Sequence, residues 1–329
     1  MTVLLLIASF ALIVGGALLF TNAVEWFGHR LNLGQGAVGS LLAAVGTALP
    51  ESLIPVVALL AGAEGEDVAI GAIVGAPFML GTIAMLLVGI SALAFKGRRD
   101  AGREIRSHIA SVNRDLGLFA VFFPLGILLG LIESKGLHYV AAAVFVLGYA
   151  VYVRYTIRGG GDTAEAEGLR PLKFDTTKKD PPSNFQIAAQ VVVGLGMIIG
   201  GAELFVEEIT KLAESLGVDA LVLSLVLAPL ATELPEKVNS FLWVRDSKDD
   251  LAIGNITGAM AFQSTMPVAL GLVFTDWALD LPAVVAGAIG LAGGLLALWR
   301  LHRGWFELPH VLAWGVLFTS FVVFVALVG

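Results

Sequence analysis

Long apolar runs alternate with short polar stretches along this chain. A helix that crosses a bilayer needs about 20 predominantly apolar residues. Ten segments meet this requirement and are predicted to be membrane-spanning helices: about 2–25, 36–62, 67–95, 115–132, 136–158, 184–210, 217–244, 249–275, 281–300 and 306–328. The first run has no Lys or Arg before it and no small-residue cleavage site, so we expect a first span rather than a signal peptide. The pattern predicts an all-α polytopic membrane protein.

Matching blocks of sequence recur in the two halves of the chain. GGALLF (15–20) returns as GGAELF (200–205), and TALPES (47–52) returns as TELPEK (232–237), in both cases 185 residues later. DVAIGAIVGA (67–76) matches DLAIGNITGA (250–259), 183 residues later. Five predicted spans separate the members of each pair, and an odd number of spans reverses the direction of the chain. The halves are therefore expected to be inverted repeats, as in secondary transporters whose substrate site lies near the midplane.

This repeat divides the chain into three predicted parts. Residues 1–158 form a first five-helix repeat with its signature region at about 40–82, and residues 184–329 form a second with its signature region at about 225–265. Residues 159–183 are rich in Gly, Pro and charge, which is typical of a flexible linker, here expected on the cytoplasmic side.

Basic residues indicate the orientation in the membrane. Of the 20 Lys and Arg residues, 17 fall on one side of the predicted spans, Lys135 and Lys211 fall on the other, and Lys237 lies within a span. The positive-inside rule places the basic side in the cytoplasm. The protein is therefore expected in the cell (inner) membrane, with both termini facing the outside. The stretch from Lys96 to Arg114 is interpreted as a solvated loop, with contact to anionic lipid headgroups as the alternative.

Composition excludes several classes of function. Only 14% of the residues are charged and 57% are hydrophobic, against about 25% charged in a soluble domain. The absence of cysteine removes disulfides, thiolate metal sites and cysteine nucleophiles. The five histidines lie at span ends, and neither an H-E-x-x-H nor a G-x-S-x-G motif is present, so we do not expect an enzyme. The expected partners are the bilayer and cations, with no nucleic acid; the oligomeric state is left open.

Glycine pairs one helical turn apart mark the third and eighth spans. Gly71 and Gly75 lie in the first repeat, and Gly254 and Gly258 lie in the second. Small residues at this spacing let helices approach closely, so we interpret them as packing surfaces. They lie inside spans with no preceding strand, which argues against nucleotide binding.

Two acids, Glu51 and Glu236, lie well inside the second and seventh spans at matched positions of the repeats. A carboxylate in hydrocarbon is costly unless it is paired, hydrated or protonated, which makes an intramembrane acid a candidate functional residue. The alternative is a carboxylate satisfied by a neighbouring helix. We predict that these two residues meet and form the metal site.

Each glutamate follows a proline, which removes a backbone N–H and disturbs the carbonyl one turn earlier. The freed carbonyls and the hydroxyls of Thr47 and Thr232 would suit Na⁺, Ca²⁺ or another hard cation. A simple packing kink is the alternative for Pro50 and Pro235.

The predicted site contains a third acid and one base. Glu233 and Lys237 belong to the second repeat, where the first repeat has Ala48 and Ser52. Three carboxylates against one ammonium leave a net charge of about −2, enough for one divalent or two monovalent cations. Equally, Lys237 could act as a tethered cation that fills part of the site. Both interpretations stay open at the level of sequence.

At these residues the chain resembles the sodium/calcium exchangers of the cation/Ca²⁺ antiporter superfamily. GTALPES (46–52) and ATELPEK (231–237) look like the two signature repeats of that family, each centred on a G-T-S-x-P-E-type motif. The resemblance implies ten helices and cation exchange by alternating access, with the first and sixth helices sliding across the other eight. It also implies that Glu51 and Glu236 are the paired ion-ligating glutamates and that no cofactor is needed besides the transported cation.

Several positions depart from the family pattern. Pro77 and Met260 stand where a polar Asn or Asp is usual, and Ala48 and Glu233 stand in place of the signature serines. Asn255 keeps a Gly-Asn pair in the second repeat only. The lost oxygens matter because Ca²⁺ takes six to eight ligands. The polar residues nearby that could replace them are Gln263, Thr265, Thr82, Asn239 and Thr257.

The sequence therefore predicts a secondary antiporter that exchanges Ca²⁺ or another cation against Na⁺ or H⁺ through a midplane carboxylate site. Proton coupling is compatible with it because crowded carboxylates favour protonation of one of them. The alternative is a transport-inactive relative that binds an ion for structural or regulatory reasons. Pro77, Met260 and Lys237 motivate this alternative, since each alters the expected ligand set.

Overall fold

The computed structural model describes residues 1–30, 51–158, 171–175 and 182–328. Within these ranges the regular structure is helical, apart from one isolated bridge between Glu104 and Trp305. Eight of the described helices are long and apolar enough to cross a membrane. Two shorter apolar stretches of helix, Glu51–Leu60 and Ala220–Leu234, lie where the second and seventh spans are expected, and the second is part of the longer helix Ala220–Arg245. The prediction of an all-helical membrane protein is confirmed.

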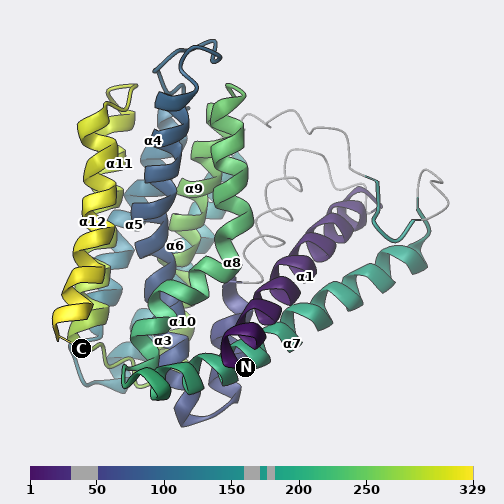
Figure 1. Cartoon of the computed structure of the whole chain (residues 1–329), viewed down its shortest axis with the longest axis vertical. Helices are drawn as coiled ribbons and strands as arrows, with labels where there is room; N and C mark the ends of the chain where they lie inside the picture. Colours follow the sequence, from purple (N-terminus) through teal and green to yellow (C-terminus); the bar gives the residue numbers. More distant parts are fainter. Residues whose placement is uncertain (31–50, 159–170, 176–181, 329) are drawn as a thin grey trace.

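Figure 1 shows the helices under the following labels. They are α1 (Thr2–Arg30), α3 (Ala63–Met79), the π-helical turn η1 (Leu80–Ala84), α4 (Met85–Ala94), α5 (Ile109–Leu129), α6 (Lys135–Arg158), α7 (Asn184–Leu216), α8 (Ala220–Arg245), α9 (Asp249–Gln263), α10 (Met266–Phe274), α11 (Leu281–Leu301) and α12 (Leu308–Val328).

Two helices extend well beyond the predicted spans, α5 at its start and α7 at its end. α5 begins at Ile109 instead of near residue 115, and its first turns carry polar side chains. α7 continues to Leu216 instead of residue 210, and it ends where Gly217 adopts a left-handed conformation with φ of 67°. Glycine is the usual residue at such a helix end.

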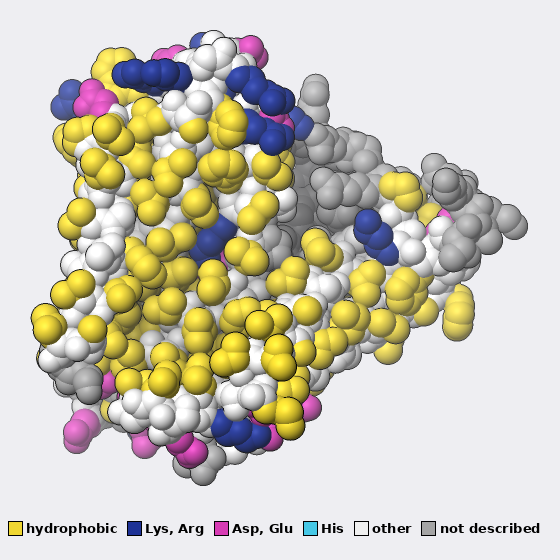
Figure 2. All heavy atoms as spheres, in the orientation of Figure 1, with side chains coloured by type: hydrophobic (Ala, Val, Ile, Leu, Met, Phe, Trp, Pro, Cys, Tyr) yellow, Lys and Arg dark blue, Asp and Glu magenta, His cyan; other side chains and the backbone are white. Residues whose placement is uncertain are grey.

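The connections between helices form two ends of different charge. The basic end comprises the connections 95–108, 246–248 and 302–307, and the opposite end comprises 130–134, 217–219 and 275–280. Hydrophobic side chains cover the middle of the face in Figure 2, and Lys and Arg gather at the basic end. α1 begins and α12 ends at the opposite end (Figure 1). This distribution is typical of a protein that crosses a bilayer.

The two sequence-matched helices α3 and α9 start from different ends. Near the start of α3, the carboxylate of Glu66 accepts a hydrogen bond from the backbone N–H of Asp276, at the opposite end. At the start of α9, the carboxylate of Asp249 binds the guanidinium of Arg99 at 2.6 and 2.7 Å, at the basic end. The matched segments therefore run in opposite directions.

α1 and α7 form a pair that is inclined to the main bundle (Figure 1). Their backbones approach closely, since a Cβ on Gly16 would lie 2.7 Å from the carbonyl oxygen of Gly194. The buried amide of Gln190 donates to Asn22 Oδ1 at 2.9 Å, and the same oxygen accepts the backbone N–H of Lys173 at 3.1 Å. The linker segment 171–175 is thus docked on this pair.

Glycines also bring α3 and α8 into backbone contact. A Cβ on Gly71 would lie 2.5 Å from the carbonyl oxygen of Leu221, and one on Gly75 would overlap the backbone of Leu225. The interpretation as a packing surface is confirmed for this pair. A Cβ on Gly254 or Gly258 would meet no atom of the described residues within 4 Å.

This difference between matched glycines gives a test of packing. Gly75→Ala is expected to destabilise the protein by about 1–3 kcal/mol, because the added methyl group overlaps the backbone of α8. Gly258→Ala is the matched control and is expected to be neutral or to stabilise by up to about 1 kcal/mol through helix propensity. Thermal unfolding of both variants in detergent measures the difference; equal unfolding midpoints would contradict this account of the α3–α8 contact.

Candidate functional site

A cluster of polar side chains lies halfway along the bundle. Glu233 and Lys237 lie near the middle of α8, Gln263 ends α9, and Glu51 is the first described residue of the helical segment Glu51–Leu60. With a rise of 1.5 Å per residue, Gln263 lies roughly 20 Å from the basic end of α9. Glu51 is 8% exposed, and the other three are 2% exposed or less. The cluster is therefore buried at mid-depth.

Glu233 and Lys237 form an ion pair on one face of α8. They are four residues apart, a spacing that places side chains next to each other on a helix. Lys237 Nζ lies 2.5 Å from Glu233 Oε2, and each side chain is 1% exposed. The ammonium also donates to the carbonyl oxygen of Pro229 at 3.4 Å. Since an isolated buried charge is strongly unfavourable, each partner makes burial of the other possible.

Gln263 joins this pair to Glu51. Its Nε2 donates to Glu51 Oε2 at 2.7 Å and to Glu233 Oε1 at 2.9 Å. The opposite amide orientation would place an oxygen against two carboxylates, so the charges fix the nitrogen in this position. Gln263 Oε1 is buried and has no hydrogen-bond partner among the described residues. The amide of Gln263 thus links two acids, one from each of the two sequence-matched regions. Its own oxygen, Oε1, accepts no hydrogen bond from the described residues.

The helix that carries Gln263 is interrupted immediately after it. Ser264 and Thr265 separate α9 from α10, and Pro267 in the first turn of α10 has no N–H for the carbonyl of Gln263. A shift of 183 residues maps this break onto η1 (Leu80–Ala84), a π-helical turn in the first half. Such turns are frequent at functional sites. Both matched spans are therefore irregular at the same repeat position.

Matched threonines occupy both irregular segments. Thr82 Oγ1 donates to the carbonyl of Phe78 at 2.7 Å, and Thr265 Oγ1 donates to the carbonyl of Ala261 at 2.9 Å. Their hydroxyl hydrogens satisfy carbonyls of their own helices. α8, in contrast, is continuous through Pro229 and Pro235, so its prolines do not break it.

The predicted ligands are only partly within the described part of the chain. Thr47 and Ala48 lie outside it, as does the side chain of Glu236, so the expected meeting of Glu51 and Glu236 stays a prediction. Thr232 is buried, and its hydroxyl donates to the carbonyl of Ala228 at 3.2 Å.

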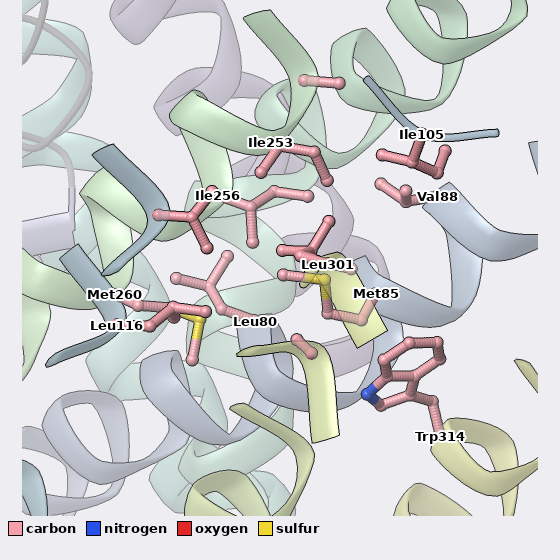
Figure 3. Close-up of a cluster of buried hydrophobic side chains, with 14 of the residues drawn as sticks. Leu80, Met85, Val88, Ile105, Leu116, Ile253, Ile256, Met260, Leu301 and Trp314 are labelled. Carbon is pink, nitrogen blue, oxygen red and sulfur yellow. The ribbon is translucent and has the colours of Figure 1, made fainter. Parts of the chain in front are cut away.

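The two family positions that lack a polar residue contribute no side-chain oxygen here. Pro77 lies inside α3 and is buried. Met260 belongs to an apolar cluster with Leu80 and Leu116, where its thioether lies among hydrocarbon side chains (Figure 3). A carboxylate at position 260 would lie among these hydrocarbon side chains.

Two other polar candidates of the second repeat have local partners away from Glu51. The Asn255 amide donates to Ser240 Oγ at 3.3 Å, and the Thr257 hydroxyl donates to Asp115 Oδ2 at 2.8 Å. Asn239 is exposed. Of the proposed replacements, Gln263 is the one that contacts Glu51 among the described residues.

Asp115 is a buried acid that sequence reasoning missed. It is 4% exposed and accepts hydrogen bonds from Thr257, from the Tyr152 hydroxyl at 2.9 Å and from Arg114 Nε at 3.4 Å. These donors satisfy the carboxylate and connect α5 with α6 and α9. The predicted span began at this residue, which made it resemble a surface acid; the available signal was the long apolar run that follows it directly.

The bridging amide gives a second test. Gln263→Leu is expected to lower the free energy of unfolding by about 2–4 kcal/mol, because two carboxylates lose a donor. Leucine is the residue at the matched position, Leu80, so its size is compatible with a span of this kind. Asn255→Leu is the control, with one hydrogen bond to a neutral hydroxyl and an expected loss of about 1 kcal/mol. Chemical unfolding in detergent measures both, and an equal loss would argue against the bridge.

Solved exchanger structures share this fold. The H⁺/Ca²⁺ exchanger CAX matches with a TM-score of 0.75 over 98% of this chain and 81% of its own, at 20% identity. The sodium-calcium exchanger NCX_Mj matches with a TM-score of 0.61 over 98% of this chain and 99% of its own, also at 20% identity.

Sequence relatives agree with this likeness. The putative antiporter CaxA of Alkalimonas amylolytica is 23% identical over 300 residues, 89% of each chain. The inner membrane protein YrbG of Escherichia coli is 25% identical over 245 residues, 74% of this chain and 70% of that protein. The family model for the sodium/calcium exchanger protein matches residues 1–158 and 187–329. The resemblance predicted from the motifs is thus confirmed, and the chain belongs to the sodium/calcium exchanger family as a divergent member of the cation/Ca²⁺ antiporter superfamily.

Proposed function

We propose that this chain is a secondary active antiporter that exchanges Ca²⁺ or another cation against Na⁺ or H⁺ by alternating access. The observation that carries the proposal is Glu51, a carboxylate buried at mid-depth and bound through Gln263 to a second acid. Intramembrane carboxylates mark ion pathways because their burial is unfavourable without a cation or proton. The likeness to an H⁺/Ca²⁺ exchanger and to a sodium-calcium exchanger supports cation cargo.

Glu51 and Glu236 are the proposed ion-binding acids. The buried Oε1 of Gln263, which belongs to the amide bound to Glu51, is a further oxygen for a cation. The hydroxyl of Thr232 donates to Ala228 and keeps its oxygen lone pairs as acceptors, and Thr47 is proposed as a ligand from its matched position in the sequence. Hard cations such as Na⁺ and Ca²⁺ prefer ligands of this type. The amide thus supplies one of the oxygens that Pro77 and Met260 do not.

Alternating access fits the proposed pair of inverted five-helix repeats, ten helices in total. The antiparallel course of α3 and α9 supports the inversion. α1 and α7 are bound to each other through Gln190 and Asn22 and lean away from the bundle, which suits them to move as one unit. Their movement past the bundle would expose the site to each side in turn.

A transport-inactive, ion-binding relative is the second candidate. Met260 packs in the core and Lys237 neutralises Glu233, so the site has fewer free oxygens than its family pattern implies. This candidate predicts cation binding without flux driven by a gradient.

Flux through reconstituted protein tests the proposal. Glu51→Gln is expected to reduce Na⁺- or H⁺-gradient-driven Ca²⁺ uptake into proteoliposomes by at least about a hundredfold, because the charge that balances the cation is lost. Glu207→Gln is the control, since Glu207 is exposed and pairs with Lys211 away from the cluster. Uptake that survives in Glu51→Gln would remove the site assignment; binding of radiolabelled Ca²⁺ by the wild type without uptake would favour the inactive relative.

The absence of native cysteine permits a direct test of the proposed orientation, with both termini outside. Ser215→Cys places a thiol on the exposed end of α7, and Arg303→Cys places one on the exposed basic end. A membrane-impermeant maleimide is expected to label Ser215→Cys in intact cells and to label Arg303→Cys only after permeabilisation. The reverse pattern would invert the topology.

A further inference from the structure

The strongest asymmetry between the repeats lies inside the site. At matched positions the first repeat has Ala48 and Ser52, and the second has Glu233 and Lys237. An acid and a base have thus been placed together on one face of α8, with no counterpart in the sequence of the other half. Their opposite charges leave the formal charge of the site unchanged.

Both oxygens of Glu233 are occupied. Oε2 binds the Lys237 ammonium at 2.5 Å, and Oε1 accepts the Gln263 amide at 2.9 Å. An ammonium group bound to a buried carboxylate stands where a small monovalent cation would bind. Glu233 is therefore closed to cargo as long as Lys237 remains in place.

We propose that Lys237 is a tethered cation that permanently fills one monovalent ion position of the transport site. The inference rests on the proposed function and specifies its cargo. Because Lys237 neutralises Glu233, that carboxylate binds no cargo cation. The site therefore takes one monovalent cation fewer than it would with serine at position 237, the residue type at the matched position of the first repeat.

A contribution to folding stability does not explain the presence of the Glu233–Lys237 pair. Replacing a buried ion pair by apolar or small residues is often neutral or stabilising, whereas removing one partner is strongly destabilising. The first repeat forms its matched segment with alanine and serine. Lys237 instead pairs with Glu233, and the Gln263 amide links Glu233 to Glu51, so the charge of Lys237 belongs to the same hydrogen-bond network as the proposed ion-binding acid.

Three variants test the tether by changing the site charge in opposite directions. Lys237→Ser frees Glu233 and is expected to add one bound monovalent cation for each protein. Glu233→Ala leaves the ammonium to balance another acid and is expected to remove one bound positive charge. The double variant Glu233→Ala/Lys237→Ser, which copies the first repeat, is expected to return to the wild-type number.

Equilibrium binding of radiolabelled Na⁺ and Ca²⁺ to the purified full chain gives the first readout. In proteoliposomes with a clamped membrane potential, the steady-state cation gradient gives the second. If a variant moves one charge more or one charge fewer in each transport cycle, its steady-state cation gradient changes by an additional factor of about ten for every ~59 mV of membrane potential. Ser224→Ala is the control, a buried hydroxyl of α8 that donates to Val68 O.

The outcomes separate this inference from the proposed function. If all variants bind the same total cation charge, or if none of them binds cations, Lys237 does not occupy an ion position and has a structural role. Wild-type protein that binds cations without exchanging them would contradict the antiporter, while the binding counts would still decide the tether. If Lys237→Ser does not fold, Glu233→Ala and the double variant give the same comparison with the opposite sign.

Discussion

A charge in the middle of a bilayer must be balanced by groups within a few ångströms, because no bulk water is there to stabilise it. Two sets of contacts in the described site provide this balance. The ammonium of Lys237 neutralises Glu233, and the two N–H groups of Gln263 bind one oxygen of Glu233 and one of Glu51. Glu51 is joined to this pair through the neutral Gln263 amide, which donates to its Oε2. A buried carboxylate that a hydrogen-bond network holds at mid-depth is the basis of cation binding in the proposed function.

The scaffold around the site combines two kinds of contact. α3 and α8 meet backbone to backbone at Gly71 and Gly75, and this close approach fixes the helix that carries Glu233. α1 and α7 are held to each other by glycines and by the Gln190–Asn22 hydrogen bond, and in Figure 1 they are inclined to the bundle, against which they pack through apolar side chains of α3 and α8. Interdigitated helices behave as one packed body. The site therefore lies on a rigid support beside a separately bonded pair.

Sequence patterns predicted the all-helical membrane architecture, the burial of Glu51 and Glu233, and the packing role of Gly71 and Gly75, because each depends on local composition or spacing. They identified Gln263 as one of five polar candidates, but the choice among five depends on how α9 is rotated, which tertiary packing sets. The ends of α5 and α7 were placed about six residues short, since hydropathy does not detect polar turns or a C-terminal glycine cap. Pro235 was expected to disturb α8, yet α8 is continuous through it. The irregular backbone lies in the following span, at Ser264–Thr265, and Pro267 lies in the first turn of the next helix. Asp115 was hidden by its place at a predicted boundary.

The glycine contacts also affect biosynthesis. Gly16 of α1 fits against α7, and Gly71 and Gly75 of α3 fit against α8, so each of these surfaces is translated long before its partner. Chains are synthesised from the N-terminus, and early segments wait for later ones to complete their packing. Until α7 and α8 are inserted, the glycine surfaces of α1 and α3 lack the helices they pack against in the finished protein. The first half therefore depends on the second for part of its packing.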